Sequence, residues 1–238
     1  MKKYFQKGWN YLWKGLLLFF VSTTLVTIIY RFVPIPLTPL MVIRLVEQGF
    51  NGEPLKLKKD WVSYEEISHH MPLAVVASED QLFLDHYGFD LKAIEKAIKN
   101  NKKKRKKTIK GGSTISQQTA KNVFLWQGRT WLRKGLEVYF TLLIETFWSK
   151  ERILEVYLNV IEMGNGIYGV EAASETYFHK HASNLNAGEC AAIAAILPNP
   201  RKWSPKKPNG YISRRKSWIL RNMRNIEILE FEEESTKE

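Results

Sequence analysis

Gly111-Gly-Ser-Thr-Ile-Ser-Gln-Gln-Thr-Ala-Lys-Asn122 is the stretch that says most about the fold and chemistry of this chain. Its Thr114-Ile-Ser-Gln117 segment has the capping-box pattern, which predicts that a helix begins there. Gln117 and Lys121 would then be neighbours on the first turns of that helix. Glycines, a helix N-terminus and a lysine together favour a bound phosphate. The residue order of nucleotide-binding P-loops is absent, and a plain helix cap is the alternative interpretation.

Ionisable residues also gather in Glu79-Asp-Gln-Leu-Phe-Leu-Asp-His-Tyr-Gly-Phe-Asp90, directly after an apolar helical segment. If that helix continued, Glu79, Phe83 and His86 would lie on one side of it. A carboxylate that emerges from an apolar segment would be partly desolvated, which makes it a better general base. An ordinary solvated helix end is the alternative.

Arg133-Lys-Gly-Leu-Glu137 opens the next predicted helix and places Arg133 and Glu137 four residues apart. On a solvated surface such an ion pair contributes only a few tenths of a kcal/mol, roughly. With Arg129 also nearby, Glu137 would instead be a second carboxylate among cations, facing the same cleft as Glu79.

The N-terminal region predicts a membrane anchor at residues 16–34. No charge interrupts the apolar run from Leu16 to Tyr30, and its flanks bring the span to about 18 residues, near the lower limit for a bilayer. A cleaved signal peptide is less favoured because no small-x-small cleavage site follows. Residues 1–15 would be cytoplasmic and the rest extracytoplasmic, because lysines precede the span and Arg31 alone follows it closely. Those lysines are Lys2, Lys3, Lys7 and Lys14.

The formal net charge of +12 points to an anionic partner: nucleic acid, acidic lipid or a phosphate-bearing substrate. An extracytoplasmic location argues against nucleic acid. The lone Cys190 excludes an internal disulfide and lies in an apolar run, which predicts a small core residue. No Cys/His cluster has metal-ligand spacing.

Helical patterns dominate the remaining sequence and predict one mainly α domain at residues 60–225. Prolines within 34–39 predict an extended exit from the membrane and a linker over 35–59, whereas 226–238 form an acidic tail. No internal repeat and no convincing alternating strand pattern is present. The expected helices begin at the capping box Ser63-Tyr-Glu-Glu66, at Pro72, after Asp90 and after Ser149, or span about 131–148, 169–178, 187–197 and 211–229.

Five blocks, in order, resemble the glycosyltransferase family 51 module, and together they cover about residues 60–225. They are Glu-Asp…Phe…His…Gly…Asp at 79–90, Gly-Gly-Ser-Thr…Gln-Gln…Lys-Asn at 111–122, Arg-Lys…Glu…Ser-Lys…Ile-Leu-Glu…Tyr-Leu-Asn at 133–159, Gly…Tyr-Gly…Ala-Ala…Tyr-Phe at 164–178, and Leu-Pro-Asn-Pro…Ser-Pro at 197–205. The resemblance implies a lysozyme-like, mostly α fold with a large lobe and a smaller, membrane-apposed lobe. No penicillin-binding transpeptidase domain follows, so the chain is similar to the monofunctional members.

The resemblance also implies an activity: polymerisation of peptidoglycan glycan strands from lipid II, inverting to a β-1,4 linkage, releasing undecaprenyl pyrophosphate and inhibited by moenomycin. Glu79 would deprotonate the 4-hydroxyl of the acceptor sugar. Glu137 would be a second carboxylate that orients the substrate or helps to hold its phosphates. The implied pyrophosphate cations are Lys121, Arg129 and Arg133, with Thr114, Gln117 and Gln118 beside them, and Asp80, Phe83 and His86 would shape the site around the base.

The implied partners are lipid II, the growing glycan strand, membrane lipids and other cell-wall synthesis or division proteins, with no nucleic acid. The implied location is the bacterial inner membrane. No cofactor is evident, although a divalent cation, Mg²⁺ or Mn²⁺, would fit the pyrophosphate site. One departure from the family is the basic run at 102–107, expected to be a mobile, solvated loop that anionic headgroups attract.

Two other functions remain open at this point. A lytic transglycosylase or lysozyme-like hydrolase would have the same class of fold but would not need the set of cations. A membrane-tethered adaptor would use the 102–107 run to bind acidic lipid or nucleic acid and would not depend on Glu79. The chemistry favours the transferase, because a pyrophosphate leaving group needs cations, whereas an acceptor hydroxyl needs a base.

Overall fold

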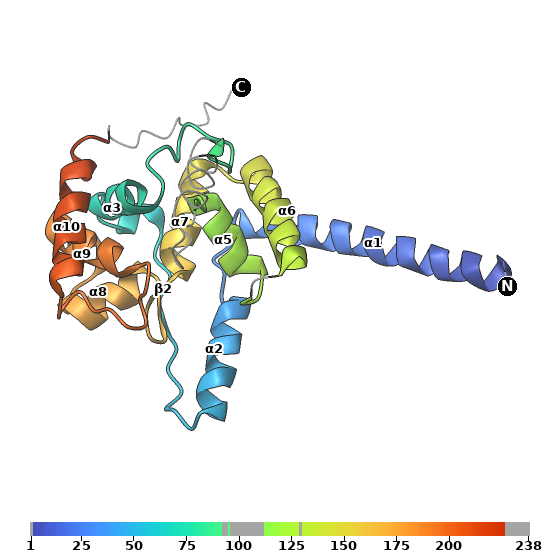
Figure 1. The fold of residues 1–238 in the computed structure, drawn as a ribbon, viewed down its shortest axis with the longest axis horizontal. Helices are drawn as coiled ribbons and strands as arrows, with labels where there is room; N and C mark the ends of the chain where they lie inside the picture. The colour runs from blue at the N-terminus through green and yellow to red at the C-terminus, as the bar shows by residue number, and fades with distance from the viewer. Residues whose placement is uncertain (1, 92–94, 96–111, 129, 227–238) are drawn as a thin grey trace.

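The computed structural model of the chain describes residues 2–91, 95, 112–128 and 130–226. Within these ranges helices predominate, which confirms the predicted mainly α class (Figure 1). The predicted basic loop at 102–107, most of the helix expected after Asp90, and tail residues 227–238 lie outside them. The helices are α1 Lys2–Tyr30, α2 Pro39–Phe50, α3 His70–Glu79, α5 Ile115–Phe124, α6 Trp131–Phe147, α7 Lys150–Val160, α8 Val170–Phe178, α9 Ala187–Ile196 and α10 Gly210–Met223, with 3₁₀ turns at Tyr64–Glu66 and Ala182–Asn184.

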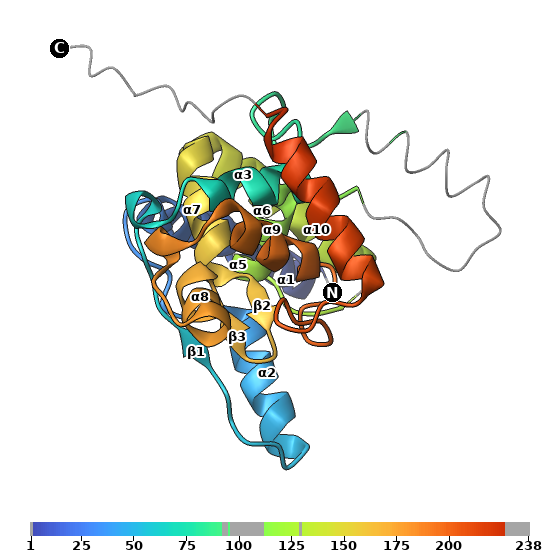
Figure 2. The same ribbon diagram turned by 90° about the vertical axis from the view of Figure 1, so that its left-hand side faces the viewer.

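The core of the domain is built around α9, which is buried along almost its whole length. Its alanines let neighbouring helices approach closely, so α3 and α10 pack against it (Figure 2). Cys190 is one of its buried residues, as the apolar run predicts, and burial raises the pKa of this thiol to about 12. The thiolate, which is the reactive form, is therefore suppressed at neutral pH.

Helix starts follow the predicted caps. Thr114 begins α5 with a complete capping box: the Thr114 N–H donates to Gln117 Oε1 at 3.0 Å, and the Gln117 N–H donates to Thr114 Oγ1 at 3.2 Å. Ser149 accepts from the Arg152 N–H at 3.1 Å at the start of α7. Such caps satisfy backbone donors that have no partner inside the helix.

The structure differs from the sequence expectations in three places. The α3 helix ends at Glu79, so Phe83 and His86 do not continue its surface; the backbone turns at Asp80, with φ −159° and ψ 80°. The helix predicted at the Ser63 capping box is a single 3₁₀ turn. A small sheet also exists, in the order β1-β3-β2, with β1 parallel and β2 antiparallel to β3. Its strands are too short for alternation to be visible in the sequence: β1 Lys58–Lys59, β2 Glu162–Gly164 and β3 Ile167–Tyr168.

The segment after the predicted anchor is extended over residues 34–38 and then forms α2, a helix that the linker prediction lacked. Thr38 caps α2, and Pro39 occupies its first turn, where a missing N–H costs nothing. Leu40 and Met41 are buried, whereas Val46 and Phe50 are exposed on the part of α2 that projects from the domain (Figures 1 and 2).

The α1 helix projects from the domain as one long rod (Figure 1). Its segment Gly8–Tyr30 is long and apolar enough to cross a membrane, and only 6% of its most apolar window is buried. The C-terminal end of α1 is nevertheless fixed to the domain. Thr23 Oγ1 lies 2.8 Å from Tyr139 Oη, Trp148 Nε1 donates to the Thr27 carbonyl at 2.7 Å, and Arg152 Nη2 donates to the Tyr30 carbonyl at 2.9 Å.

Candidate active site

Glu79 is the last residue of α3, and side chains from α5 and α10 reach its carboxylate. Arg215 of α10 donates from Nη2 to Glu79 Oε1 at 3.1 Å, and Gln118 of α5 donates from Nε2 to Oε2 at 3.3 Å. The Glu79 side chain is 16% exposed, so it is partly desolvated, as its position after an apolar segment predicts. A carboxylate fixed on both oxygens but still open to solvent is well oriented to accept a proton.

Arg215 is a site residue that the sequence did not indicate. Its Nη2 also donates to Ser78 Oγ at 2.8 Å, so the guanidinium is tied to two consecutive residues at the end of α3. The Nε–H of Arg215 is buried and has no hydrogen-bond partner in the described part of the chain. Arg215 therefore holds the Glu79 carboxylate in place.

Gln118 is itself oriented by Tyr157, whose hydroxyl donates to Gln118 Oε1 at 3.3 Å. Burial raises the pKa of Tyr157 well above 10, and the negative charges of Glu79 and Asp80 raise it further. The phenol therefore stays protonated and acts as a donor. Because this donor occupies the amide oxygen of Gln118, the amide nitrogen is the atom that faces Glu79.

Asp80, Phe83 and His86 follow Glu79 in the sequence and stabilise the end of α3 on which its carboxylate lies. Asp80 Oδ2 accepts from the Ile115 N–H at 2.9 Å, which ties the end of α3 to the start of α5. Asp80 Oδ1 lies 2.9 Å from His86 Nε2. Phe83 is fully buried, with Lys150 Nζ 4.7 Å from the centre of its ring. These residues hold the site together, and Phe83 has no exposed surface with which to meet a substrate.

A compact group of charges lies at the start of α6. Glu137 is 3% exposed, and both of its oxygens are bound by cations. Arg133 Nη1 donates to Oε2 at 3.0 Å, and Lys134 Nζ donates to Oε1 at 2.5 Å. Glu137 thus holds two cations at fixed positions. Because the carboxylate is buried, the Arg133–Glu137 pair differs from the solvated surface pair that was the alternative prediction.

Lys121 of α5 completes this group. Burial lowers the pKa of Lys121; Glu137 raises it in part, and the charges of Arg133 and Lys134 lower it further. No carboxylate oxygen lies within ion-pair distance of Lys121 Nζ among the described residues. A partly buried lysine beside two other cations is poised to bind an anionic group such as a phosphate.

The α5 helix brings the base and the cations together. Gln118 contacts Glu79, and Lys121 follows three residues later, so their Cβ atoms are about 5–6 Å apart on one face of the helix. The predicted grouping of Glu79, Gln118, Lys121, Arg133 and Glu137 is therefore consistent with the geometry. Lys134, adjacent to Arg133 in the sequence, was not singled out but belongs to the group.

An apolar pocket of about 280 Å³ lies between α1 and the α5–α6 pair. Phe124, which lines it, follows Lys121 by about one turn of α5. The lining residues of this pocket are Phe19, Ser22, Thr23, Val26, Phe124, Leu125, Trp126, Leu136 and Phe140.

Two other predicted site residues, Thr114 and Gln117, stabilise the start of α5. The polar atoms of Thr114 and Gln117 bind each other in the α5 cap, and Thr114 Oγ1 also donates to the Gly88 carbonyl at 2.7 Å. Both side chains are almost fully buried, so neither is available as a substrate ligand in this arrangement. Arg129 lies outside the described residues.

The divalent cation expected at the pyrophosphate site stays a prediction; both oxygens of Glu137 there are bound by Arg133 and Lys134. Elsewhere in the described ranges, Glu171, Glu175 and His181 bring three potential ligand atoms within 4.8 Å of one another. There, Glu171 Oε1 lies 2.7 Å from His181 Nδ1, and Oε2 accepts from the Ala182 N–H. These contacts account for the cluster without an ion.

Comparison with known sequences defines the class of protein. A sequence model of the transglycosylase family matches residues 49–224, which is most of the chain. The chain therefore belongs to the transglycosylase family: it is a glycosyltransferase with a lysozyme-like, mainly helical domain.

Curated relatives are similar over nearly the whole chain. A protein from Bacteroides thetaiotaomicron, named biosynthetic peptidoglycan transglycosylase, is 56% identical over 87% of this chain and 83% of its own length. A protein of the same name from Bdellovibrio bacteriovorus is 56% identical over 87% of this chain and 82% of its own length. Another, from Pseudomonas syringae pv. tomato, is 51% identical over 90% of each chain.

Proposed function

We propose that this protein is a peptidoglycan glycosyltransferase of cell-wall biosynthesis that polymerises glycan strands from lipid II, a disaccharide–peptide linked to undecaprenyl pyrophosphate. The observation that carries the proposal is the pairing of one oriented carboxylate, Glu79, with a cation group one helical turn along α5. The names of the relatives support peptidoglycan as the polymer.

In the proposed step, a carboxylate oxygen of Glu79 takes the proton from the 4-hydroxyl of the acceptor sugar. The freed oxygen forms a bond to C1 of the donor sugar as the bond from C1 to the phosphate oxygen breaks. The electron pair leaves with undecaprenyl pyrophosphate, and Glu79 later returns its proton to water. Attack opposite the leaving group converts the donor's α linkage into a β-1,4 linkage.

The cation group would stabilise the negative charge that develops on the pyrophosphate. Lys121, Arg133 and Lys134 lie together around Glu137, and fixed charges need no reorganisation during the reaction. This explains why the reaction needs no general acid: pyrophosphate leaves as an anion. A glycosidase cleaving between sugars would need an acid and a second carboxylate, and both oxygens of Glu137 are engaged by cations.

The apolar pocket between α1 and the α5–α6 pair supports a lipid-linked donor. A pyrophosphate held at Lys121 would have its lipid chain next to Phe124 and Leu136, on the side where α1 contacts the domain. In the proposed topology α1 spans the inner membrane, so the lipid could stay in or near the bilayer while its headgroup reacts.

The test is turnover of labelled lipid II by the purified full chain in detergent, with products separated by length and with moenomycin as a known family inhibitor. Wild type should make moenomycin-sensitive polymers. Glu79→Gln should lose about 10²–10⁴-fold in rate, because the amide cannot accept the proton, and should keep its affinity for the donor. Glu175→Gln, the same change at an exposed residue of α8, is the matched control.

Two outcomes would contradict the proposal. Wild type that consumes no lipid II, or that only shortens preformed glycan, would point to the hydrolase instead. If Glu79→Gln kept more than about a tenth of the wild-type rate, Glu79 could not be the sole base.

A further inference from the structure

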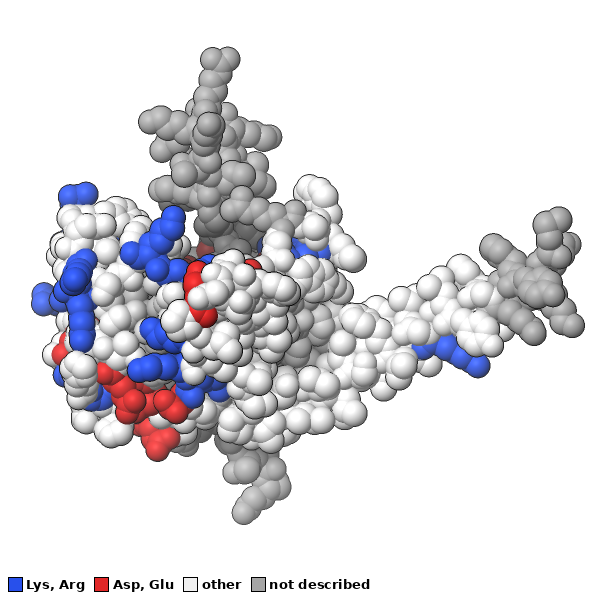
Figure 3. Space-filling view, turned by 90° about the horizontal axis from the view of Figure 1, so that it is seen from below, with Lys and Arg blue, Asp and Glu red and all other residues white. Residues whose placement is uncertain are grey.

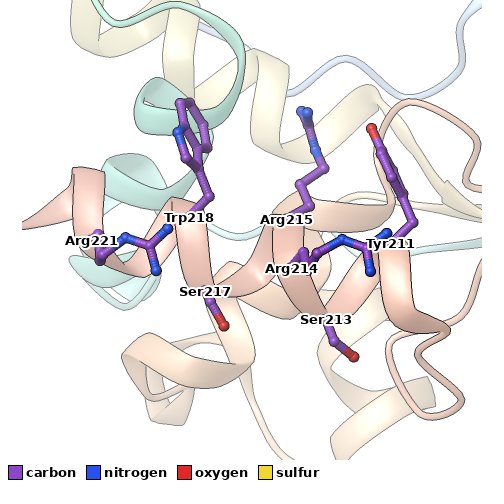
Figure 4. A pocket seen from close by; sticks show the side chains of 7 residues that line it. All are labelled: Tyr211, Ser213, Arg214, Arg215, Ser217, Trp218 and Arg221. Carbon is purple, nitrogen blue, oxygen red and sulfur yellow. The ribbon is translucent and has the colours of Figure 1, made fainter.

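One face of α10 forms a pocket of about 640 Å³ that the proposed reaction does not use. Tyr211, Arg214, Arg215, Trp218 and Arg221 line it at helical spacing, together with two serines (Figure 4). Tyr211 and Trp218 are 47% and 40% exposed, and Trp203 packs beside Tyr211 with the ring centres 5.3 Å apart.

The cations of this pocket lack counter-charges within the protein. Arg214 and Arg221 are both exposed, and no carboxylate lies within ion-pair distance of either in the described part of the chain. Arg215 differs, because it turns toward α3 and binds Glu79 at 3.1 Å. The pocket therefore combines two uncompensated guanidinium groups with two exposed rings, and through Arg215 it is continuous with the residue proposed as the base.

Such a surface fits a ligand that carries carboxylates and also has flat, weakly polar faces. Guanidinium groups bind carboxylates in bidentate geometry, and the C–H faces of sugar rings pack on aromatic rings. Membrane headgroups would also satisfy the arginines, but α10 lies at the end of the domain opposite to α1 (Figure 1). Figure 3 shows Lys and Arg side chains gathered on this half of the molecule, away from α1. A membrane crossed by α1 would not reach them.

We propose that the α10 pocket binds the peptide-bearing glycan strand beyond the reacting sugars. Arg214 and Arg221 bind free carboxylates of its peptide stems, and Tyr211 and Trp218 pack against its sugars. This inference rests on the proposed function, since that reaction produces a strand carrying one peptide per disaccharide. A strand whose reacting end lies at Glu79 passes Arg215 and reaches this surface directly. The pocket then retains the strand between additions.

The experiment measures binding without turnover. Soluble glycan oligomers released from cell wall are titrated calorimetrically into the full chain in detergent, both with their peptides and after an amidase has removed them. The test variant is Arg214→Gln/Arg221→Gln. The matched control is Lys202→Gln/Lys207→Gln, which removes the same charge from exposed residues that do not line the pocket. A third variant, Trp218→Ala, tests sugar packing, and thermal unfolding of each variant checks its fold.

The test variant should bind peptide-bearing oligomers about 5- to 30-fold more weakly, as expected for two partly exposed ion pairs, and peptide-free oligomers as wild type does. Trp218→Ala should weaken both ligands. With lipid II, the test variant should consume substrate within about twofold of the wild-type rate but release shorter polymers.

Equal losses of oligomer affinity in the test variant and the lysine control would overturn the proposal, because the loss would then follow from the change in net charge. Unchanged binding of the oligomers by the test variant would also overturn the proposal. If the test variant instead lost adsorption to phosphatidylglycerol vesicles, the pocket would bind membrane headgroups and not the strand. Failure of the proposed function is a separate result: wild type would not polymerise lipid II, whatever the oligomer titrations show.

Discussion

Lys121 must keep its positive charge in a partly buried position if it is to bind pyrophosphate. Burial and the neighbouring cations lower its pKa from the usual 10.5, so it loses its proton at a lower pH than an exposed lysine. In the proposed reaction the charged form binds the donor, so kcat/KM should fall as the pH rises through that lowered pKa. In Lys121→Arg the guanidinium stays charged, and this alkaline decline should move to higher pH.

The measurement is kcat/KM for lipid II between about pH 7 and 11, because this quantity reports groups of the free enzyme. Lys121→Ala should lose about 30- to 1,000-fold at neutral pH, which corresponds to about 2–4 kcal/mol of charge stabilisation, and should lack the alkaline decline. If wild type and Lys121→Arg declined at the same pH, Lys121 would not be the titrating group.

Individual site residues were predictable where spacing along one helix determines which side chains are in contact. Arg133 and Glu137 are four residues apart on a helix, and they form the expected ion pair. Arg215 and Glu79 are 136 residues apart, and their contact depends on how α10 packs against α3, which no local pattern encodes. Thr114 and Gln117 belong both to a helix-capping pattern and to a family motif, and in the structure they form the hydrogen bonds of the α5 cap.

At the scale of elements, the cap of α5 connects the base to the cations, and its loss should be costly. Thr114→Ala would leave the buried Gly88 carbonyl and the Gln117 N–H without their partner. We expect a loss of about 2–3 kcal/mol in the free energy of unfolding. Thr130→Ala is the matched control, because Thr130 caps α6 in the same way but is exposed; it should cost about 0.5–1 kcal/mol.

Thermal unfolding followed by circular dichroism distinguishes the two variants, since about 1 kcal/mol shifts Tm by about 2–4 °C in a domain of this size. Thr114→Ala should also slow turnover, because α5 positions both Gln118 and Lys121. Equal Tm shifts in Thr114→Ala and Thr130→Ala would show that burial of the cap does not matter.

Elements with strong local signals were predictable, whereas those that depend on distant partners were not. Ser149 and Thr114 mark helix starts that the structure confirms. The β1 strand exists because Lys58 and Lys59 pair with Ile167 and Tyr168, more than 100 residues later in the chain. The end of α3 likewise depends on a distant partner, since Asp80 binds the backbone of α5.

At the scale of the whole molecule, hydrogen bonds attach the C-terminal end of α1 to the domain, and in the proposed topology this attachment determines where the site lies relative to the membrane. Hydrogen bonds join the last two turns of α1 to Tyr139 of α6, to Trp148 and to Arg152 of α7. The apolar pocket between α1 and the α5–α6 pair includes residues of α1 itself. In the proposed reaction, the lipid of the donor stays in the bilayer while its headgroup meets Lys121.

This arrangement requires a particular orientation in the membrane, which reporter fusions can test. Four lysines precede the apolar segment of α1, and Arg31 follows it, so the N-terminus should stay in the cytoplasm and the domain should lie outside. A reporter active only in the cytoplasm should work at residue 5 and fail after residue 238, and one active only outside should do the reverse.

Replacing Lys2, Lys3, Lys7 and Lys14 by Gln should weaken this preference, whereas the same number of Gln substitutions in the 102–107 run should not, because that run lies far beyond the charges that set orientation. Cytoplasmic reporter activity at the C-terminal position would place Glu79 and Lys121 on the side opposite to the proposed substrate, and the proposed function would fail with the topology.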